Sequence, residues 1–218
     1  MRARSVVHVL SMELFGASLS LSEFPARPEI RGIGLSDWPP FAERLARKLN
    51  YTNTYYHAEP RLDILSDPDP QLVGTVDVLI ASEVFEHLPP PVSRAFANCH
   101  RLLKPTGILV FTSPYTKDDM THEYYPDLYN YEVIEEDGEL VVKNVARDGR
   151  EQTFRKLLIH GGEGATVEMR IFAEASLMED FKQAGFGRVK VYNEPDFAHG
   201  IYWNADWSGG SFPISARK

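Results

Sequence analysis

Residues 77–88, DVLIASEVFEHL, decide the fold. The stretch belongs to a nearly continuous apolar run from Val76 to Ala81, broken by one acidic residue. Such runs are typical of strands that are buried on both faces of a parallel sheet. Polar side chains follow at Ser82 and Glu83, where the strand leaves the sheet. The stretch therefore predicts a buried parallel strand with polar groups at its carboxyl end.

Strand and helix patterns alternate on both sides of this stretch. Downstream, a helix is expected from apolar residues at helical spacing, and a further strand from residues 108–112. Upstream, residues 30–34 predict a strand, a helix should begin at Pro39, and strands are expected at residues 51–56 and, briefly, at 61–64. This alternation predicts an α/β, Rossmann-like, doubly wound and mostly parallel seven-stranded sheet with helices on both faces.

The two ends of the chain add elements to this sheet. Apolar spacing predicts an entry helix over residues 3–15, which Gly16 ends. Residues 131–146 alternate around Asp137-Gly138, which predicts a β-hairpin insertion after the fifth strand. Near the far end, Ser176 and Glu179 predict a capping box for a helix that stops near Gly185, and a strand should follow at residues 189–192.

Bulk composition limits the classes of function. The 218 residues fit one domain, and 31 acidic against 23 basic residues give a net charge of -8, which argues against a nucleic-acid partner. The single cysteine, Cys99, excludes an internal disulfide and a Cys-rich zinc site, and no metal-binding motif is present. No apolar run approaches the ~20 residues that span a bilayer. We therefore expect a cytoplasmic protein without a membrane partner or bound metal, whose association into a homodimer stays open.

Three strand ends carry polar or glycine residues suited to a ligand. Open α/β sheets bind ligands at the carboxyl ends of their strands. The turn after the first strand, with Gly32, Gly34, Ser36 and Asp37, could let a ligand approach the backbone. The other two ends are marked by Asp63 and by Ser82-Glu83.

The segments 77–88 and 101–115 closely resemble the fourth and fifth strand motifs of class I S-adenosylmethionine-dependent methyltransferases. The resemblance covers residues 30–115 and implies S-adenosylmethionine as cofactor. It implies that the Gly32–Asp37 turn flanks the methionine part, that Asp63 lies near the adenine, and that Ser82 and Glu83 border the sulfonium. For Glu86 and His87, a cofactor-side contact and a structural hydrogen bond at the helix entry are equally open.

The chain departs from this family in two places. The family's first strand usually ends in an acidic residue and three glycines, but here two glycines are followed by Ser36. The acid that normally holds the ribose is replaced by Tyr55, Tyr56 and His57. A second register also stays open, in which residues 5–10 form the first strand and the glycine turn is missing.

Candidate catalytic residues come from the second half of the chain. The sequence from His160 through Gly161-Gly162 to Glu168-Met169-Arg170 resembles a bacterial subgroup of the same family. An imidazole can remove a hydroxyl proton near neutral pH, so His160 is a candidate base, with His122 as substitute and Glu168 as carboxylate alternative. A loop hydrogen bond is the competing interpretation for each histidine. The aromatic residues Tyr202, Trp203 and Trp207 are interpreted as core or lid, or as the lining of an acceptor pocket.

These observations predict one methyltransferase-like domain over residues 1–218. Residues 1–29 would form the entry helix and linker, 30–115 the cofactor-binding half and 116–218 the acceptor-side half. The predicted activity is methyl transfer to a small-molecule or saccharide acceptor, at oxygen. The alternative is a catalytically impaired, methyltransferase-like module that binds a ligand or a partner.

Overall fold

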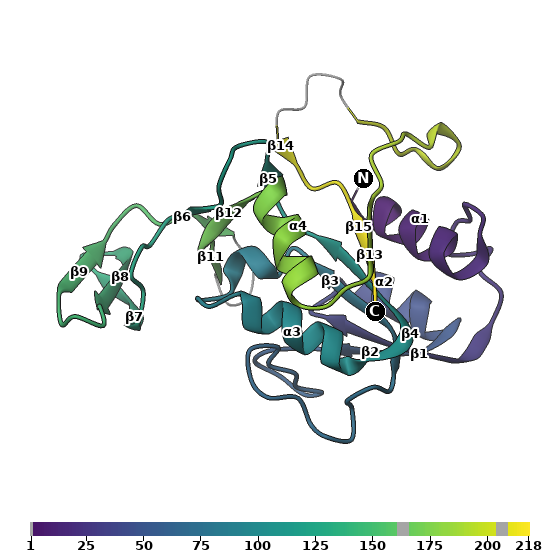
Figure 1. Cartoon of the computed structure of the whole chain (residues 1–218), viewed down its shortest axis with the longest axis horizontal. Coiled ribbons are helices and arrows are strands. Elements are labelled where there is room, and N and C mark those ends of the chain that lie inside the picture. Colours follow the sequence, from purple (N-terminus) through teal and green to yellow (C-terminus); the bar gives the residue numbers. More distant parts are fainter. Residues whose placement is uncertain (1, 161–165, 204–208) are drawn as a thin grey trace.

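The central feature of the chain is a six-stranded mixed sheet (Figure 1). A computed structural model describes residues 2–160, 166–203 and 209–218. The strand order is β13-β15-β4-β3-β1-β2. The four strands that run parallel to one another are β1 (Arg27–Leu35), β2 (Leu49–Thr54), β3 (Val76–Ser82) and β4 (Leu103–Thr112). Strand β15 (Ile214–Arg217) runs antiparallel to both β4 and β13 (Arg188–Val191). The predicted α/β class is confirmed, and six mixed strands replace the predicted seven.

A predicted strand at residues 61–64 does not form, which accounts for one difference. Within this segment the described backbone makes one β-bridge, between Tyr55 and Arg61. The carboxylate of Asp63 then accepts hydrogen bonds from the backbone N–H of Leu65 and the hydroxyl of Ser66. These bonds close a turn, so the backbone cannot continue as a strand. Asp63 therefore lies in a turn rather than at a strand end.

Helices cover both faces of the sheet, as predicted. One face carries α1 (Arg2–Phe15) and α2 (Pro39–Ala46), and the other carries α3 (Ser93–Leu102) and α4 (Glu174–Gln183). Alternate residues of β3 separate accordingly, because Val78 and Ile80 pack with α1 and α2 while Leu79 and Ala81 pack with α3 and α4.

The structure shows which segment forms the first strand of the sheet. Residues 5–10, the first strand of the alternative register, belong to α1. Segment β1 pairs with both β3 and β2, so it is an interior strand of the sheet. The alternative register is therefore wrong, and the turn after Gly34 is the turn that follows the first strand.

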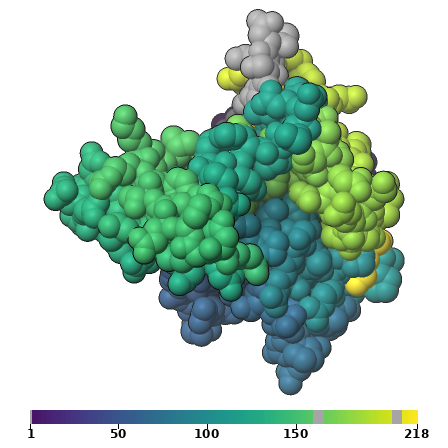
Figure 2. All heavy atoms as spheres, turned by 60° about the vertical axis from the view of Figure 1, so that its left-hand side comes forward, coloured from purple at the N-terminus to yellow at the C-terminus, as the bar shows by residue number. Residues whose placement is uncertain are grey.

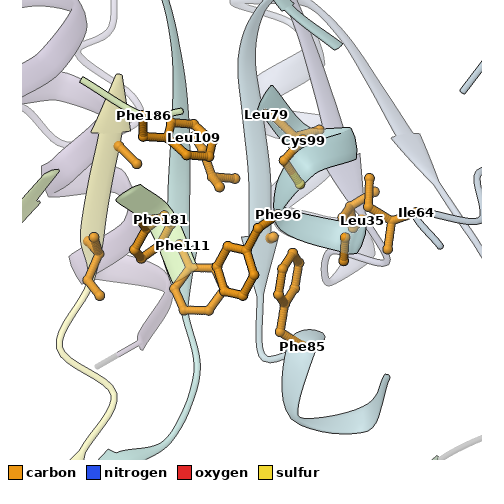
Figure 3. Close-up of a cluster of buried hydrophobic side chains, with 14 of the residues drawn as sticks. Leu35, Ile64, Leu79, Phe85, Phe96, Cys99, Leu109, Phe111, Phe181 and Phe186 are labelled. Atoms are coloured by element: carbon orange, nitrogen blue, oxygen red, sulfur yellow. The ribbon is translucent and has the colours of Figure 1, made fainter. Parts of the chain in front are cut away.

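A group of phenylalanine rings fixes the loop after β3 (Figure 3). Phe85 opens the short 3-10 helix η1 (Phe85–His87) and meets Phe96 of α3 edge to face, with ring centroids 4.7 Å apart. Phe111 of β4 and Phe181 of α4 complete the group, and all four rings are fully buried. Truncating such a ring typically costs about 3–5 kcal/mol. The packing thus holds η1, with Glu86 and His87, firmly at the carboxyl end of β3.

A three-stranded antiparallel sheet stands out from the main body as an arm (Figures 1 and 2). It consists of β7 (Asn130–Glu136), β8 (Glu139–Val145) and β9 (Glu151–Phe154). Asp137 and Gly138 both have positive φ, 54° and 80°, as a two-residue hairpin turn requires. The predicted hairpin insertion is confirmed, and β9 is an addition that the sequence pattern did not predict.

Short strands connect the arm to the sheet. A second sheet contains β14 (Gly209–Gly210), β5 (Tyr115–Thr116), β12 (Arg170–Ala173) and β6 (His122–Glu123), while β10 (Ile159–His160) pairs with β11 (Thr166–Val167).

The predicted capping box is wrong, because α4 begins at Glu174 and the Ser176 hydroxyl accepts a hydrogen bond from Thr121 instead. None of the helices in the described ranges is long and apolar enough to cross a membrane.

Candidate active site

The carboxyl ends of the parallel strands lie side by side at one edge of the sheet. Leu35 pairs with Thr54, and Ser82 pairs with Thr112. Because the chain leaves β1 and β3 in opposite directions along the sheet, the edge between them is a topological switch point, where open α/β sheets bind ligands.

Two residues at this switch point have an unusual backbone conformation. Ser36, directly after β1, has φ 57°, and Glu83, directly after β3, has φ 56°. A positive φ is uncommon for residues other than glycine and costs about 1–3 kcal/mol, and such residues cluster at functional sites. This edge of the sheet is therefore the leading candidate for the site.

The protein's own side chains fill the space beside the two predicted glycines. A side chain at Gly32 would collide with the ring of Tyr51, and one at Gly34 would collide with the Asp37 carboxylate and the Tyr51 hydroxyl. The Tyr51 hydroxyl donates to Asp37, while the backbone N–H of Asp37 donates to Asn53 Oδ1 at 2.9 Å. Both glycines are thus needed for internal packing, and their contact with a ligand stays a prediction.

Burial changes the ionisation of Asp37. Its side chain is 6 % exposed, and burial raises its pKa to about 7, although the hydrogen bond from Tyr51 acts in the opposite direction. Asp37 is therefore close to half-protonated at neutral pH. Next to it, Ser36 is exposed and lies toward solvent.

Glu83 provides a buried carboxylate oxygen at the switch point. Its Oε2 lies 3.3 Å from Nη1 of Arg2, while its Oε1 is buried without a hydrogen-bond partner in the described structure. A buried carboxylate oxygen without a donor is costly unless a ligand completes it. The neighbouring Ser82 hydroxyl is already in contact with the Thr112 hydroxyl at 2.9 Å. The chemistry of Glu83 fits a cationic ligand group.

Glu86, for which a cofactor-side contact and a helix-entry hydrogen bond were equally open, is a second buried carboxyl at this edge. It is fully buried, and Oε2 accepts a hydrogen bond of 2.9 Å from the Ser113 hydroxyl, while Oε1 has no hydrogen-bond partner among residues 2–160, 166–203 and 209–218. Burial, followed by the negative charge of Glu83, raises its pKa to about 8. In the sequence, the position of Glu86 directly before His87, in a turn after a buried strand, is the feature that marks it as a candidate.

Residues 167–170 pack onto η1 and bring Glu168 toward this edge. The Met169 N–H donates to Glu86 O at 2.7 Å, and His87 Nδ1 lies 3.1 Å from Val167 O. Glu168 is buried, and its charge contributes to the raised pKa of Glu86. Among the predicted catalytic residues, Glu168 is thus placed beside the predicted cofactor-side residue His87.

Arg170 links this segment to the residues of and around η1. Its guanidinium is fully buried and donates to the carbonyls of Phe85 and Leu88 at 2.9 and 2.6 Å. It also forms an ion pair with Glu123 at 2.7 Å.

The remaining predicted residues lie apart from this group or outside the described residues. His122 is exposed on β6, and its ring meets Tyr124 at a centroid distance of 5.1 Å. The backbone of His160 belongs to β10, but its side chain, the turn at Gly161–Gly164 and Trp207 lie outside the described residues. Tyr202 is exposed, and Trp203 packs against Phe212. No group of metal-ligating side chains occurs in the part of the chain that is described.

Comparisons with known proteins agree with this geometry. Residues 25–109 match a family model described as a methyltransferase domain, and no curated protein matches the sequence. The fold is similar to the sugar N-methyltransferase KedS8 from Streptoalloteichus sp ATCC 53650, with a TM-score of 0.54 and 11% identity over 100% of this chain and 86% of that one. It is also similar to 1,6-didemethyltoxoflavin-N1-methyltransferase from Burkholderia thailandensis, with a TM-score of 0.52 and 15% identity over 100% and 78%.

A third similar structure has a different kind of activity. The [4+2]-cyclase SpnF has a TM-score of 0.50 and 16% identity, over 98% of this chain and 80% of that one. Identities this low show the shared fold alone. The acceptor and the reaction must therefore be argued from the residues at the edge of the sheet.

Proposed function

We infer that this chain, which has the fold of class I S-adenosylmethionine-dependent methyltransferases and a methyltransferase-domain match over residues 25–109, methylates a small-molecule or saccharide acceptor at oxygen. The predicted resemblance to that family and the predicted cofactor, S-adenosylmethionine, are confirmed. The acceptor class and the accepting atom are our proposal, as is the single-domain division into a cofactor-binding half over 30–115 and an acceptor-side half over 116–218.

The observation that carries this function is the pair Ser36 and Glu83. Both have positive φ at the switch point, and Glu83 offers a buried carboxylate oxygen that has no donor in the part of the chain that the structure describes. When bound, S-adenosylmethionine supplies a methyl group on a positively charged sulfur. A carboxylate close to that charge favours binding in a partly desolvated site. Glu83 is therefore the residue that we assign to the sulfonium side of the cofactor.

Other residues take part in cofactor binding in this proposal. The Gly32–Asp37 turn flanks the methionine part, Asp63 lies toward the adenine, and Ser82 and His87 complete the edge. His87 is held by its contact with Val167 O, which supports a positioning role. Asp63 is half-buried and caps its own turn, so its contribution would come through the shape of that turn.

On the acceptor side the chain must align a hydroxyl with the methyl group and accept its proton. Alignment can supply a large part of the acceleration, and a positioned base adds typically 10²–10⁴-fold. We assign the base role to Glu168 first, because it is buried beside η1. His160 is the second candidate and exposed His122 the third.

One observation favours the alternative, a catalytically impaired binding module. The Asp37 carboxylate and the Tyr51 hydroxyl fill the space beside Gly34, and Ser36 stands where the family has glycine. Calorimetric titration separates a cofactor-binding protein, active or impaired, from a pure interaction protein: the former binds S-adenosylmethionine and its demethylated product, whereas the latter binds neither. The turnover assay that follows separates an active enzyme from an impaired one.

The acceptor is tested by incubating the protein and S-adenosylmethionine with small-molecule extracts and with simple saccharides. The proposal predicts a product about 14 dalton heavier than its precursor, one methylene in mass, which is the signature of methyl transfer.

Glu168→Gln should lower the turnover at least about 100-fold with little change in cofactor affinity. The matched control Glu132→Gln, on the exposed face of the arm, should leave turnover unchanged. Product from nitrogen acceptors alone would contradict O-methylation.

A further inference from the structure

A pocket lies between α1 and α2, away from the core of the sheet. It encloses about 650 Å³, within the usual range for small-molecule sites. Its two walls come from the N-terminal half of α1 and from α2, and its roof from the 3-10 helix η2 (Phe197–His199) and Gly200. In Figure 1 the segment that carries η2, drawn in yellow-green, lies beside α1.

The charged residues that line this pocket are basic. Arg4 of α1 and Arg44 of α2 contribute guanidinium groups, and no Asp or Glu is among the described lining residues. Arg44 is exposed and makes neither an ion pair nor a hydrogen bond with the described part of the chain. Arg4 donates one bond of 3.3 Å to Gly200 O, which leaves its other donors available. In a protein of net charge -8, such a lining favours an anion.

Two large aromatic side chains among the lining residues of the same pocket are strongly exposed. Trp38 is 66 % exposed and Phe197 is 77 % exposed, although both are costly to leave in water. Phe41, Leu19 and Leu21 provide apolar surface within the pocket. Aromatic faces of this kind stack on planar apolar rings.

A hydrogen-bonded cluster holds the roof in place. The Asp196 carboxylate accepts bonds from the Ser18 hydroxyl and from His199 Nδ1, the latter at 2.7 Å. His8 Nδ1 lies 2.8 Å from the same Ser18 hydroxyl, so α1, the following loop and η2 are joined. The backbones of Asp196 and Ile201 also exchange two hydrogen bonds, of 2.8 and 2.9 Å. The pocket is thus largely pre-formed, which lowers the entropic cost of binding.

We propose that this pocket binds a small organic anion, with a carboxylate or phosphate monoester between Arg4 and Arg44 and a planar apolar ring against Trp38 and Phe197. The site is separate from the one assigned to the cofactor, because its lining contains none of the residues proposed there. Arg44 is the main anion contact, since its guanidinium has no ion-pair or hydrogen-bond partner among the described residues.

Phenyl phosphate is the test probe, with benzyl alcohol as its neutral counterpart and inorganic phosphate as the ring-free one. Isothermal titration should give saturable binding of phenyl phosphate to the whole chain and at least tenfold weaker binding of the other two. Arg44→Ala should weaken phenyl phosphate binding about tenfold. Arg47→Ala, an exposed arginine just beyond α2 and outside the pocket, should not. Circular dichroism checks that both variants fold.

Several outcomes overturn the proposal. These are the absence of saturable binding to the unaltered chain, equal affinity for benzyl alcohol, equal affinity for inorganic phosphate, and equal losses in the two arginine variants. Displacement of phenyl phosphate by saturating S-adenosylhomocysteine would also contradict it, because the pocket would then belong to the cofactor site. Retained binding in the presence of S-adenosylhomocysteine supports a separate site.

Discussion

The Ser113 hydroxyl donates a hydrogen bond of 2.9 Å to the Glu86 carboxyl, and both side chains are fully buried. This bond joins the end of β4 to η1. Ser113 follows β4 directly, and Glu86 lies in the turn after β3, so the bond ties together two neighbouring carboxyl ends of the sheet. The carboxyl keeps its proton at neutral pH because burial raises its pKa to about 8.

This ionisation makes the stability of the protein depend on pH. Between the ordinary pKa of a glutamate and about 8, the unfolded chain loses the proton of Glu86 while the folded chain retains it. Stability therefore decreases as pH rises through this window and levels off above it. Glu86→Gln removes the effect, so the variant should gain at least about 1 kcal/mol relative to the parent between pH 5.5 and 8.5. Urea unfolding at both pH values measures this difference, and a pH-independent difference would contradict the buried protonated carboxyl.

The Asp37–Tyr51 pair gives a second pH-dependent prediction. Tyr51→Phe removes the hydroxyl that donates to the buried Asp37 carboxyl. We expect a loss of about 0.5–1.5 kcal/mol at pH 5.5, where Asp37 is protonated, and about 1.5–3 kcal/mol at pH 8.5, where it is ionised. Thermal or urea unfolding of Tyr51→Phe at the two pH values tests this. Tyr129→Phe, on the exposed surface of the arm, is the control and should change stability little.

Arg170 should be one of the most sensitive positions in the second half of the chain. Arg170→Met leaves the carbonyls of Phe85 and Leu88 without their donor, and we expect a loss of about 3–5 kcal/mol, the usual cost of breaking a buried charged contact. Arg170→Lys keeps the charge but cannot reproduce the forked donor, so it should recover only part of the loss. Chemical unfolding measures both. A loss below 1 kcal/mol for Arg170→Met would show that η1 is held by its phenylalanine contacts alone.

Cys99 offers a direct probe of core opening. It is fully buried, and burial raises the pKa of its thiol well above its ordinary value. The folded protein should therefore react with a thiol reagent at least 100-fold more slowly than the unfolded chain, because the thiolate is the reacting form. The rate of colour formation with an aromatic disulfide, with and without denaturant, measures this ratio. Similar rates in both conditions would mean that α3 does not pack as described.

The sheet could be predicted from the sequence because its strands carry strong local signals. The apolar run from Val76 to Ala81 predicts a buried strand, and the alternation around Asp137-Gly138 predicts a hairpin. The structure contains both. The short segment at 61–64 was misjudged because the Asp63 side chain closes a turn, an effect that apolar spacing does not reveal. Strand β15 was missed since its four residues gain their stability from pairing with β4, which is distant in the sequence.

The candidate site was only partly predictable. The sequence marks Glu83 and His87 because they follow a recognisable strand. It cannot show that Glu86 is fully buried, since burial depends on Ser113 and on residues 167–170 packing from elsewhere. The pocket between α1 and α2 was missed for the same reason, because its roof at Phe197–His199 comes from almost the far end of the chain.

The central claim, that Glu83 lies beside the sulfonium of the cofactor, is tested most directly by comparing two ligands that differ in charge at sulfur. S-adenosylmethionine carries a positive sulfur, whereas S-adenosylhomocysteine carries a neutral one. Isothermal titration of Glu83→Gln should show affinity for S-adenosylmethionine reduced about tenfold, equivalent to about 1.4 kcal/mol, and affinity for S-adenosylhomocysteine reduced less than about threefold. Equal losses for both ligands, or none for either, would contradict this placement of Glu83.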